Sequence, residues 1–341
     1  MEGYNVPFAI LAGSNKGRHK EMEISDKNKT GKLYNTQFLD GDTKLYEKLS
    51  NGKSVLENTL EAAFPVASKK PAIIGDSDRL RKEIGDKAYI EEQYGESLSD
   101  NVYQMIDFMR EIGENSGFVL MGGDLPSVST DDLEEFVQNS YEKNKDVVMG
   151  LVDMDEMRYA YERIRSPDTE WPKKFGIRFK DKKCSYTSCN PKLTFGTVFF
   201  IKDTLYEKND LLHERMDEII RLKRVFNEKE NYPIIAEFLK DHGKAINKPP
   251  KNRLSLAYFA LTNSTPLRRM LFGNLLSKAK NDYSMDVSEL EELIEHKVLD
   301  NRLSFGIVRA PPMFGYDIDD KNDITIADNI IRARYQSENQ S

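Results

Sequence analysis

Four short runs of apolar residues, each followed by a polar loop, constrain the fold of this chain most. They lie at residues 8–12, 72–75, 117–121 and 146–152. Apolar runs of this length without polar alternation are typical of strands that are buried on both faces, as in a parallel sheet. Because helical segments separate the runs, the sequence predicts an α/β fold in which helices cover both faces of a mostly parallel sheet.

The helices between these runs are predicted from apolar spacing and from capping residues. Ser54 with Glu57 and Ser129 with Asp132 each form a capping box before an apolar helical face. Residues 98–112 repeat apolar side chains at helical spacing. From residue 153 to 200 the regularity weakens. Later elements are expected as strands at 176–179, 195–201 and 305–308, and as helices at 211–226, 234–239, 254–261, 267–276, 290–298 and 324–334.

Composition excludes several classes of protein. The chain has 341 residues, 39% of them hydrophobic, and a net charge of −7, so it can bury a core and has no basic surplus typical of nucleic-acid binders. No apolar run approaches the roughly 18 residues of a membrane span. Cys184 and Cys189 are too few for a disulfide framework, and we therefore expect a cytoplasmic protein.

The loop after the first apolar run has the composition of a phosphate-binding loop. In an open parallel sheet, ligands bind outside the carboxyl ends of the strands, where the strand order reverses. The loop reads LAGSNKGR from Leu11 to Arg18. Its small residues let backbone N–H groups approach a polyphosphate, and Lys16 and Arg18 add positive charge. An ordinary surface loop with two basic residues is the alternative.

Two acidic segments follow later apolar runs. Asp124 lies in the turn GGDLP directly after the run at 117–121, where a carboxylate can hold a hard cation such as Mg²⁺. A helix cap is the alternative, weakened because Ser129 is better placed to cap. Asp317, Asp319, Asp320 and Asp323 fall within seven residues, and a divalent cation would relieve their repulsion. For Asp320 and Asp323 a helix N-terminus is the favoured alternative.

Other common chemistries have no support in the sequence. The four histidines show no metal-binding spacing, and no GxSxG motif marks a serine nucleophile. Neither zinc chemistry nor covalent catalysis is therefore expected.

The order of these segments resembles the nucleotidyltransferase family with a Rossmann-like fold of the GT-A type, on the side of the molybdenum-cofactor guanylyltransferases and NTP transferases. LAGSNKGR stands in register with the family's LAGGxGxR, and Lys44 precedes a Gly52-Lys53 turn and a helix. The turn at 123–126 and the segment 317–319 follow in the family's order. The resemblance covers residues 6–152 and 303–334.

The sequence departs from the family in several places. Ser14 replaces the second loop glycine, Lys16 replaces the third, and Gly17 comes one place late. Thr43 stands where proline is usual. Because of the changed glycines, we expect a different path of the backbone around the phosphates.

The resemblance implies a three-layer fold with an added helical part. It divides the chain into a nucleotidyltransferase core at 1–203, with a nucleotide-binding half at 1–152 and an acceptor-side segment at 153–203. A helical addition follows at 204–300, and a final strand and helix at 301–341 return to the core. The apolar faces of the added helices suit packing on the sheet or a homodimer contact equally well.

The resemblance also implies a reaction, in which a nucleoside monophosphate passes from a nucleoside triphosphate to a phosphorylated sugar, alcohol or cofactor, releasing pyrophosphate. It assigns catalysis to Arg18, Lys44 and Asp124, and Mg²⁺ or Mn²⁺ binding to Asp124, Asp317 and Asp319. The implied nucleotide-binding residues are Leu11, Ala12, Gly13, Ser14, Lys16, Gly17, Arg18, Lys44, Gly75, Asn101 and Gly123.

Two alternatives stay open. One is a glycosyltransferase of the same fold that uses a nucleotide-sugar. The other is a nucleotide-binding module without catalytic activity.

Overall fold

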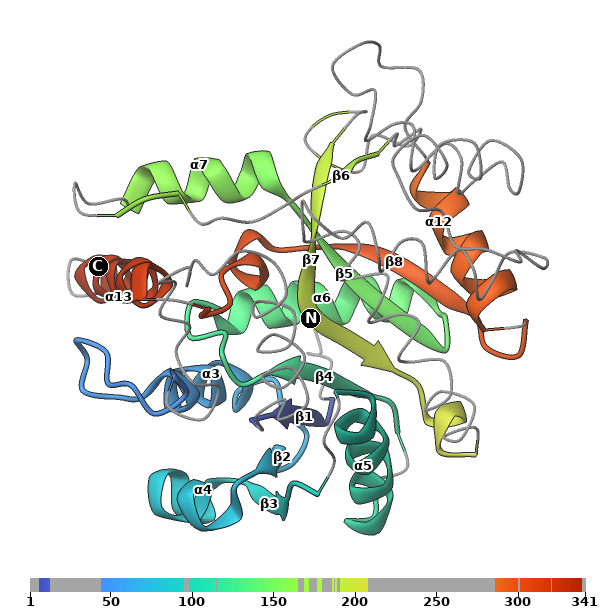
Figure 1. Cartoon of the computed structure of the whole chain (residues 1–341), viewed down its shortest axis with the longest axis horizontal. Coiled ribbons are helices and arrows are strands. Elements are labelled where there is room, and N and C mark those ends of the chain that lie inside the picture. Colours follow the sequence, from blue (N-terminus) through green and yellow to red (C-terminus); the bar gives the residue numbers. More distant parts are fainter. Residues whose placement is uncertain are drawn as a thin grey trace, which may run out of the picture.

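The part of the chain that the structure describes is built around one eight-stranded sheet with helices on both sides (Figure 1). The computed structural model describes residues 6–12, 44–94, 98–114, 116–164, 169–171, 177–179, 186, 188, 191–207, 286–299, 301–319 and 321–338.

The amino-terminal elements form one wing of the sheet. In chain order they are β1 (Phe8–Leu11), α3 (Val55–Ala63), β2 (Ala72–Gly75), α4 (Ser77–Ile84), η1 (Gly85–Lys87), β3 (Tyr89–Glu92) and α5 (Leu98–Glu111).

The later elements complete the sheet and its helical layers. They are β4 (Phe118–Gly122), α6 (Thr130–Lys143), β5 (Val147–Asp153), α7 (Met154–Ile164), β6 (Ile177–Arg178), β7 (Lys192–Ile201), η2 (Asp203–Tyr206), α12 (Val287–Leu293), the π-helical η4 (Ile294–Val298), β8 (Phe305–Ala310), η5 (Pro312–Gly315) and α13 (Lys321–Glu338).

The sheet is mostly parallel, as the apolar runs predicted. Its strand order is β3-β2-β1-β4-β7-β5-β8, with β6 paired to β7. The neighbours of β1 and β2 are all parallel to them, and β8 is parallel to β5. Strand β7 runs antiparallel to β4, β5 and β6. The strands expected at 176–179 and 195–201 are present as β6 and β7, and β7 lies between β4 and β5 in the middle of the sheet.

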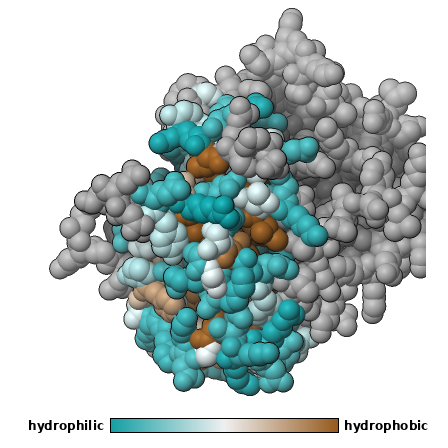
Figure 2. Space-filling view, turned by 90° about the vertical axis from the view of Figure 1, so that its left-hand side faces the viewer, coloured by the Kyte–Doolittle hydropathy of each residue, from teal (hydrophilic) through white to brown (hydrophobic). Residues whose placement is uncertain are grey.

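Helices cover both faces of the sheet, which confirms the three-layer expectation. Along β1, Phe8 and Ile10 point to the layer that contains α3, α4, α6, α7 and α13, whereas Ala9 points to the layer that contains α5 and α12. This alternation follows from the two-residue repeat of a strand. The side of the molecule that lies at the left in Figure 1 is mainly hydrophilic, with small separate hydrophobic spots (Figure 2).

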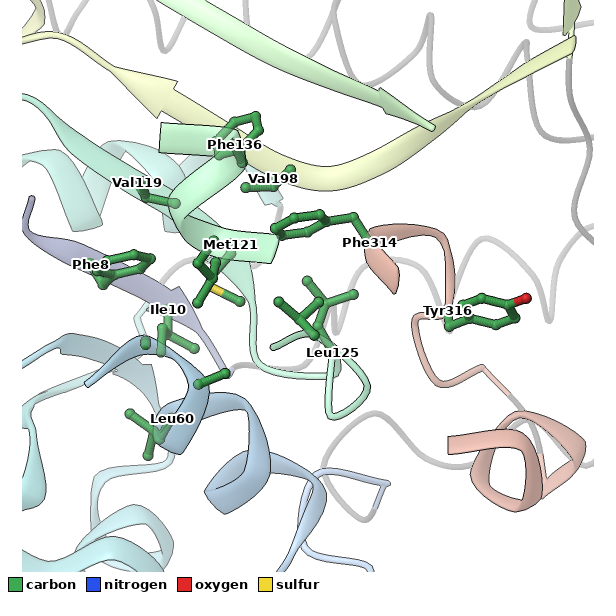
Figure 3. Packing of buried hydrophobic residues seen from close by; sticks show 14 of the residues in the cluster. Phe8, Ile10, Leu60, Val119, Met121, Leu125, Phe136, Val198, Phe314 and Tyr316 are labelled. Carbon is green, nitrogen blue, oxygen red and sulfur yellow. The ribbon is translucent and has the colours of Figure 1, made fainter. Parts of the chain in front are cut away.

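The core between the sheet and the first helical layer is densely aromatic and aliphatic (Figure 3). The Phe136 ring of α6 lies 5.7 Å from the Phe314 ring of η5, measured between centroids. Phe314 belongs to the segment after β8, so this contact holds the carboxy-terminal part of the chain against the sheet. Burial of such rings contributes about 1.5–3 kcal/mol each.

Both predicted capping boxes are present. The Ser54 side chain accepts from the Glu57 N–H at the start of α3, and Ser129 accepts from the Asp132 N–H at the start of α6. Because Ser129 caps α6, Asp124 is not needed for that purpose.

Two α-helices and one strand were not predicted. Helix α4 buries only Leu80 and Ile84, so its apolar signal is weak. Strand β3 lies at the edge of the sheet and is half-exposed, so it lacks a continuous apolar run. The expectation of weak regularity after residue 153 was wrong for α7, whose buried Met154, Met157 and Tyr161 follow helical spacing.

Part of the expected helical addition lies outside the described residues, namely the helices at 211–226, 234–239, 254–261 and 267–276. The expected helix at 290–298 is described as α12 and η4. The division of the chain at residues 203 and 300 stays a proposal. No helix of the described part is long and apolar enough to cross a membrane.

Candidate functional site

The strand order reverses at β1, which has β2 on one side and β4 on the other. The chain leaves both β1 and β4 at the same edge of the sheet. There the Gly123 N–H donates to the Leu11 carbonyl at 2.9 Å, and the Ala12 N–H donates to the Ile74 carbonyl at 2.9 Å. The residues after β1, β2 and β4 are therefore joined at the position where ligands bind in open α/β sheets.

Asp124 lies at this edge, two residues after β4. A side chain on Gly122 would collide with it, because a Cβ there would lie 2.5 Å from Asp124 Oδ1. Behind the turn, the Thr59 hydroxyl of α3 donates to the Gly123 carbonyl at 3.1 Å. The two glycines thus let the turn fold closely against β4 and α3, with the carboxylate on its outer side.

Lys44 contacts Asp124 and the carboxy-terminal segment at once. Its Nζ donates to Asp124 Oδ2 and to the Ile318 carbonyl, both at 2.6 Å. The Ile318 N–H donates in turn to the Asp124 carbonyl at 3.1 Å. Asp319 Oδ1 lies 4.0 Å from Lys44 Nζ. Three segments that are distant in the sequence therefore meet around one ammonium group.

The surroundings of Lys44 keep it protonated. Its side chain is 16% exposed and that of Asp124 is 17% exposed. Burial opposes the charged form, but the carboxylates of Asp124 and Asp319 outweigh it, so the pKa of Lys44 is raised above its usual 10.5. The ammonium is thus a fixed positive charge at neutral pH.

The aspartates around the start of α13 have two different roles. Asp323 accepts the Asp319 N–H at 2.9 Å and so serves the start of the helix, in line with the alternative weighed for it. Asp320 lies outside the described residues. Asp319 is 49% exposed and faces the Lys44 ammonium.

The donor set here suits a hard cation only in part. Within the residues that the structure describes, no three His, Cys, Asp or Glu side chains lie close enough to hold a metal ion. Oxygens of Asp124 and Asp319 do approach one positive charge, that of Lys44. Mg²⁺ commonly takes only one or two protein carboxylates, with phosphate and water oxygens as its other ligands. The carboxylates therefore fit Mg²⁺ that arrives with a phosphate ligand.

Gly75 and Asn101 lie on the β2 side of this edge. A Cβ on Gly75 would lie 3.1 Å from the Ala12 carbonyl oxygen, so the two segments are in close contact. The Gln93 N–H donates to the Gly75 carbonyl at 2.9 Å, which ties the residues after β3 to the same edge. Asn101, in the first turn of α5, is buried, and its Oδ1 has no hydrogen-bond partner among the residues that the structure describes. A buried acceptor without a partner is costly and favours a ligand donor.

Asp317 precedes Ile318, and its carboxylate also contributes to the raised pKa of Lys44. The other predicted residues lie outside the described part, and their roles stay predictions: Gly13, Ser14, Lys16, Gly17 and Arg18.

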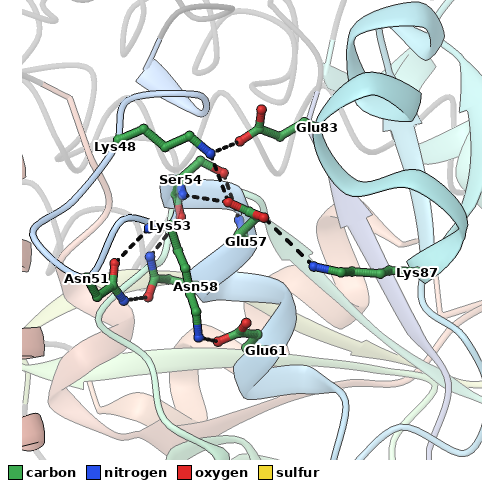
Figure 4. A network of polar contacts seen from close by, with 9 residues as sticks. All are labelled: Lys48, Asn51, Lys53, Ser54, Glu57, Asn58, Glu61, Glu83 and Lys87. Atoms are coloured by element: carbon green, nitrogen blue, oxygen red, sulfur yellow. Dashed lines mark hydrogen bonds and ion pairs between the residues drawn. The ribbon is translucent and has the colours of Figure 1, made fainter.

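Some residues that shape the site were missed from the sequence. A short hairpin follows Lys44, and it is fixed by a polar network that includes Lys48, Glu57 and Glu83 (Figure 4). Its Ser50 N–H donates to Asp328 Oδ1 of α13 at 2.6 Å. No local signal predicts this contact, because it joins residues 278 positions apart.

No protein-family model and no curated protein sequence matches the chain. Among solved structures, it is similar to a hypothetical transferase from Thermus thermophilus, with a TM-score of 0.54 and 15% identity over 94% of this chain and 99% of that one. The chain therefore has the Rossmann-like α/β fold of that protein.

Two further solved structures align less closely. The inositol-1-phosphate CTP transferase from T. maritima gives a TM-score of 0.42 and 12% identity over 97% of this chain and 98% of that one. CMP:2-keto-3-deoxy-manno-octonic acid synthetase, in complex with CTP, gives 0.39 and 13% over 65% and 85%.

Proposed function

We propose that the chain is a divalent-cation-dependent nucleotidyltransferase, which transfers a nucleoside monophosphate from a nucleoside triphosphate to a phosphorylated small molecule. The observation that carries this proposal is the meeting of Lys44, Asp124 and Ile318 where the strand order reverses. Such a reaction requires a nucleotide-binding position in the fold, a protonated lysine and exposed carboxylate oxygens.

The transfer needs charge neutralisation and alignment more than covalent chemistry. An ammonium has three N–H donors. Two of the three N–H groups of Lys44 donate to acceptors among the described residues. The third is available to a phosphate oxygen. Lys44 would therefore bind the α-phosphate and stabilise the charge that develops when the acceptor's oxygen attacks and pyrophosphate leaves.

Asp124 and one of Asp317 or Asp319 would hold Mg²⁺ or Mn²⁺. The cation would neutralise charge on the phosphate oxygens. Asp124 would also keep Lys44 oriented, since the two side chains are in contact.

The nucleotide would lie across β1, β2 and β4. The backbone at Leu11, Ala12, Gly75 and Gly123 would approach the base and sugar. The buried Asn101 Oδ1 would accept a hydrogen bond from the base. The loop at 13–18, with Lys16 and Arg18, is proposed to bind the triphosphate.

The finer parts of the proposal rest on the sequence. The relationship to molybdenum-cofactor guanylyltransferases rests on the order of the motifs, the cytoplasmic location on the two cysteines, and a homodimer on the apolar faces of the added helices. The acceptor is proposed as a sugar, alcohol or cofactor phosphate.

The test needs no knowledge of the acceptor. Each of the four α-³²P-labelled nucleoside triphosphates is incubated with the protein, Mg²⁺ and a low-molecular-mass filtrate of a cell extract. We expect one label to move into a new compound with release of pyrophosphate, and we expect chelation or Asp124→Asn to abolish the transfer. If the folded protein transfers no label from any of the four triphosphates, the proposal is refuted. Transfer of sugar from a nucleotide-sugar instead would support the glycosyltransferase alternative.

A further inference from the structure

Lys44 is held in place through the short hairpin that follows it. Within this hairpin the Leu49 N–H donates to the Lys53 carbonyl at 2.9 Å, and the Gly52 N–H donates to the Leu49 carbonyl at 2.8 Å. Gly52 has a φ of +78°, which glycine adopts without strain. The turn leaves the Ser50 N–H without a partner inside the hairpin, and Asp328 of α13 accepts it.

The hairpin is also fixed to α3. The Leu45 carbonyl accepts the Leu56 N–H at 3.0 Å, and the Glu47 carbonyl accepts the Val55 N–H at 3.1 Å. These two N–H groups belong to the first turn of α3, which has no intrahelical acceptors for them. The backbone next to Lys44 is therefore part of the cap of α3.

Side-chain contacts join the hairpin to more than one helix. Asn51 contacts Asn58 and Lys53 contacts Glu61, and both contacts join the hairpin to α3. Lys48 contacts Glu57 and Glu83, but its side chain is 52% exposed, so solvent screens these ion pairs. Asp328, which is 17% exposed, joins the hairpin to α13 through the Ser50 N–H.

Asp328 belongs to α13, which starts two residues after Asp319. Asp328 lies seven positions after Lys321 in this helix, a rigid length of about 10 Å. The same helix thus carries the carboxylate segment at one end and the anchor of the Lys44 hairpin further along.

We propose that Asp328 is a positioning residue for Lys44: by accepting the Ser50 N–H, it keeps the lysine in register with Asp124 and Asp319. The inference rests on the proposed function, since register matters only if these groups act together on a substrate. Asp328 itself does not touch the substrate.

The chain offers a matched set of variants. Asp328→Ala removes the acceptor, whereas Asp328→Asn keeps an oxygen for the Ser50 N–H. Arg332→Ala is the control, because Arg332 contacts the other carboxylate oxygen of Asp328 at 2.7 Å and leaves the Ser50 hydrogen bond intact. Ser50→Pro removes the same hydrogen bond from the donor side, at a turn position that accepts proline. It provides a second variant if Asp328→Ala fails to fold.

The first measurement is amide hydrogen exchange in the hairpin, which does not depend on activity. With Asp328→Ala, we expect the Leu49, Gly52 and Leu56 amides to exchange about fivefold faster, as the loss of one hydrogen bond of typical net strength gives. Amides of β5 should not change. Asp328→Asn and Arg332→Ala should stay within about twofold of the unmodified protein. Unchanged exchange in the hairpin with Asp328→Ala would overturn the inference.

The second measurement is the kinetics of nucleotidyl transfer, well below the melting temperature. With Asp328→Ala, the factor by which kcat falls should be about ten times the factor by which KM for the triphosphate rises. The reason is that Lys44 acts on charge that develops in the transition state. Asp328→Asn should restore kcat. Faster exchange with an unchanged kcat would show a merely structural anchor and overturn the positioning role. If the unmodified protein transfers no nucleotide, the proposed function fails, while the exchange result still decides whether Asp328 anchors the hairpin.

Discussion

Lys44 and Asp124 lie 80 positions apart in the chain, and their side chains meet at 2.6 Å on the edge of the sheet where the strand order reverses. The contact depends on the whole topology. Asp124 is placed by β4, Lys44 by the hairpin before α3, and Ile318, which binds both, by the segment after β8. A small displacement of any of these three segments changes the site.

Replacing Asp124 by asparagine separates its chemical role from its structural one. Asparagine keeps an oxygen that can accept from Lys44, so the fold should persist with a loss of about 1 kcal/mol. Loss of the negative charge should lower nucleotidyl transfer at least about 100-fold, as for other preorganised charged groups. Pyrophosphate release and circular dichroism measure the two effects. The exposed Asp131→Asn is the control, and equal activity of both variants would contradict the assignment.

Gly122→Ala should disturb Asp124 without changing any charge. The new methyl group would lie 2.5 Å from Asp124 Oδ1, so the carboxylate must move away. We expect a loss of activity of about tenfold or more, from misplacement of a reacting group. If Gly122→Ala were as active as the unmodified protein, the position of the Asp124 carboxylate would not matter.

The raised pKa of Lys44 predicts a specific dependence of stability on pH. The folded protein binds this proton more tightly than the unfolded chain does, so the contribution of Lys44 is complete below pH 10.5 and is lost as the pH rises through the folded pKa. Urea unfolding of the unmodified protein and of Lys44→Met should therefore give a difference in free energy that shrinks above pH 10.5. A constant difference would show that the ion pair does not stabilise the fold. Lys321→Met is the exposed control.

Two glutamates of the α12 region cap the exposed edge of β8. Glu291 Oε1 accepts the Ile307 N–H at 2.6 Å, and Glu295 Oε2 accepts the Phe305 N–H at 3.1 Å. Four residues of helix rise about 6 Å, which matches the spacing of alternate strand residues. Unprotected edges pair with other chains.

We therefore expect the double variant of Glu291→Ala and Glu295→Ala to self-associate in sedimentation velocity and to lose about 1–2 kcal/mol of stability. The exposed Glu292→Ala should do neither. A double variant with the association state and the stability of the unmodified protein would refute the edge-capping role.

The sequence predicted those features of the fold that depend on local pattern. Continuous apolar runs identified β1, β2, β4 and β5, and serine–acid spacing identified the starts of α3 and α6, because both signals lie within a few residues. Strand β3 was not predicted, since an edge strand needs no continuous apolar run. The contact of Lys44 with the Ile318 carbonyl was not predicted either, because it spans 274 positions and no pattern within either segment indicates it.

For the site, Asp124 could be predicted from its place directly after a buried strand, and Lys44 from the order of the family's motifs. The pairing between them is set by tertiary packing alone. The roles of Arg18 and the loop at 13–18 stay predictions, as those residues lie outside the described part.

The most direct test of the central claim is a thermal-shift comparison of ATP, GTP, CTP and UTP, each with and without Mg²⁺. A ligand at 100 times its Kd stabilises the folded state by about 2.7 kcal/mol. The account predicts that one triphosphate raises the melting temperature, that the rise requires Mg²⁺, and that Asp124→Asn abolishes it. If no triphosphate changes the melting temperature, or if the shift is the same with Asp124→Asn, the account is contradicted.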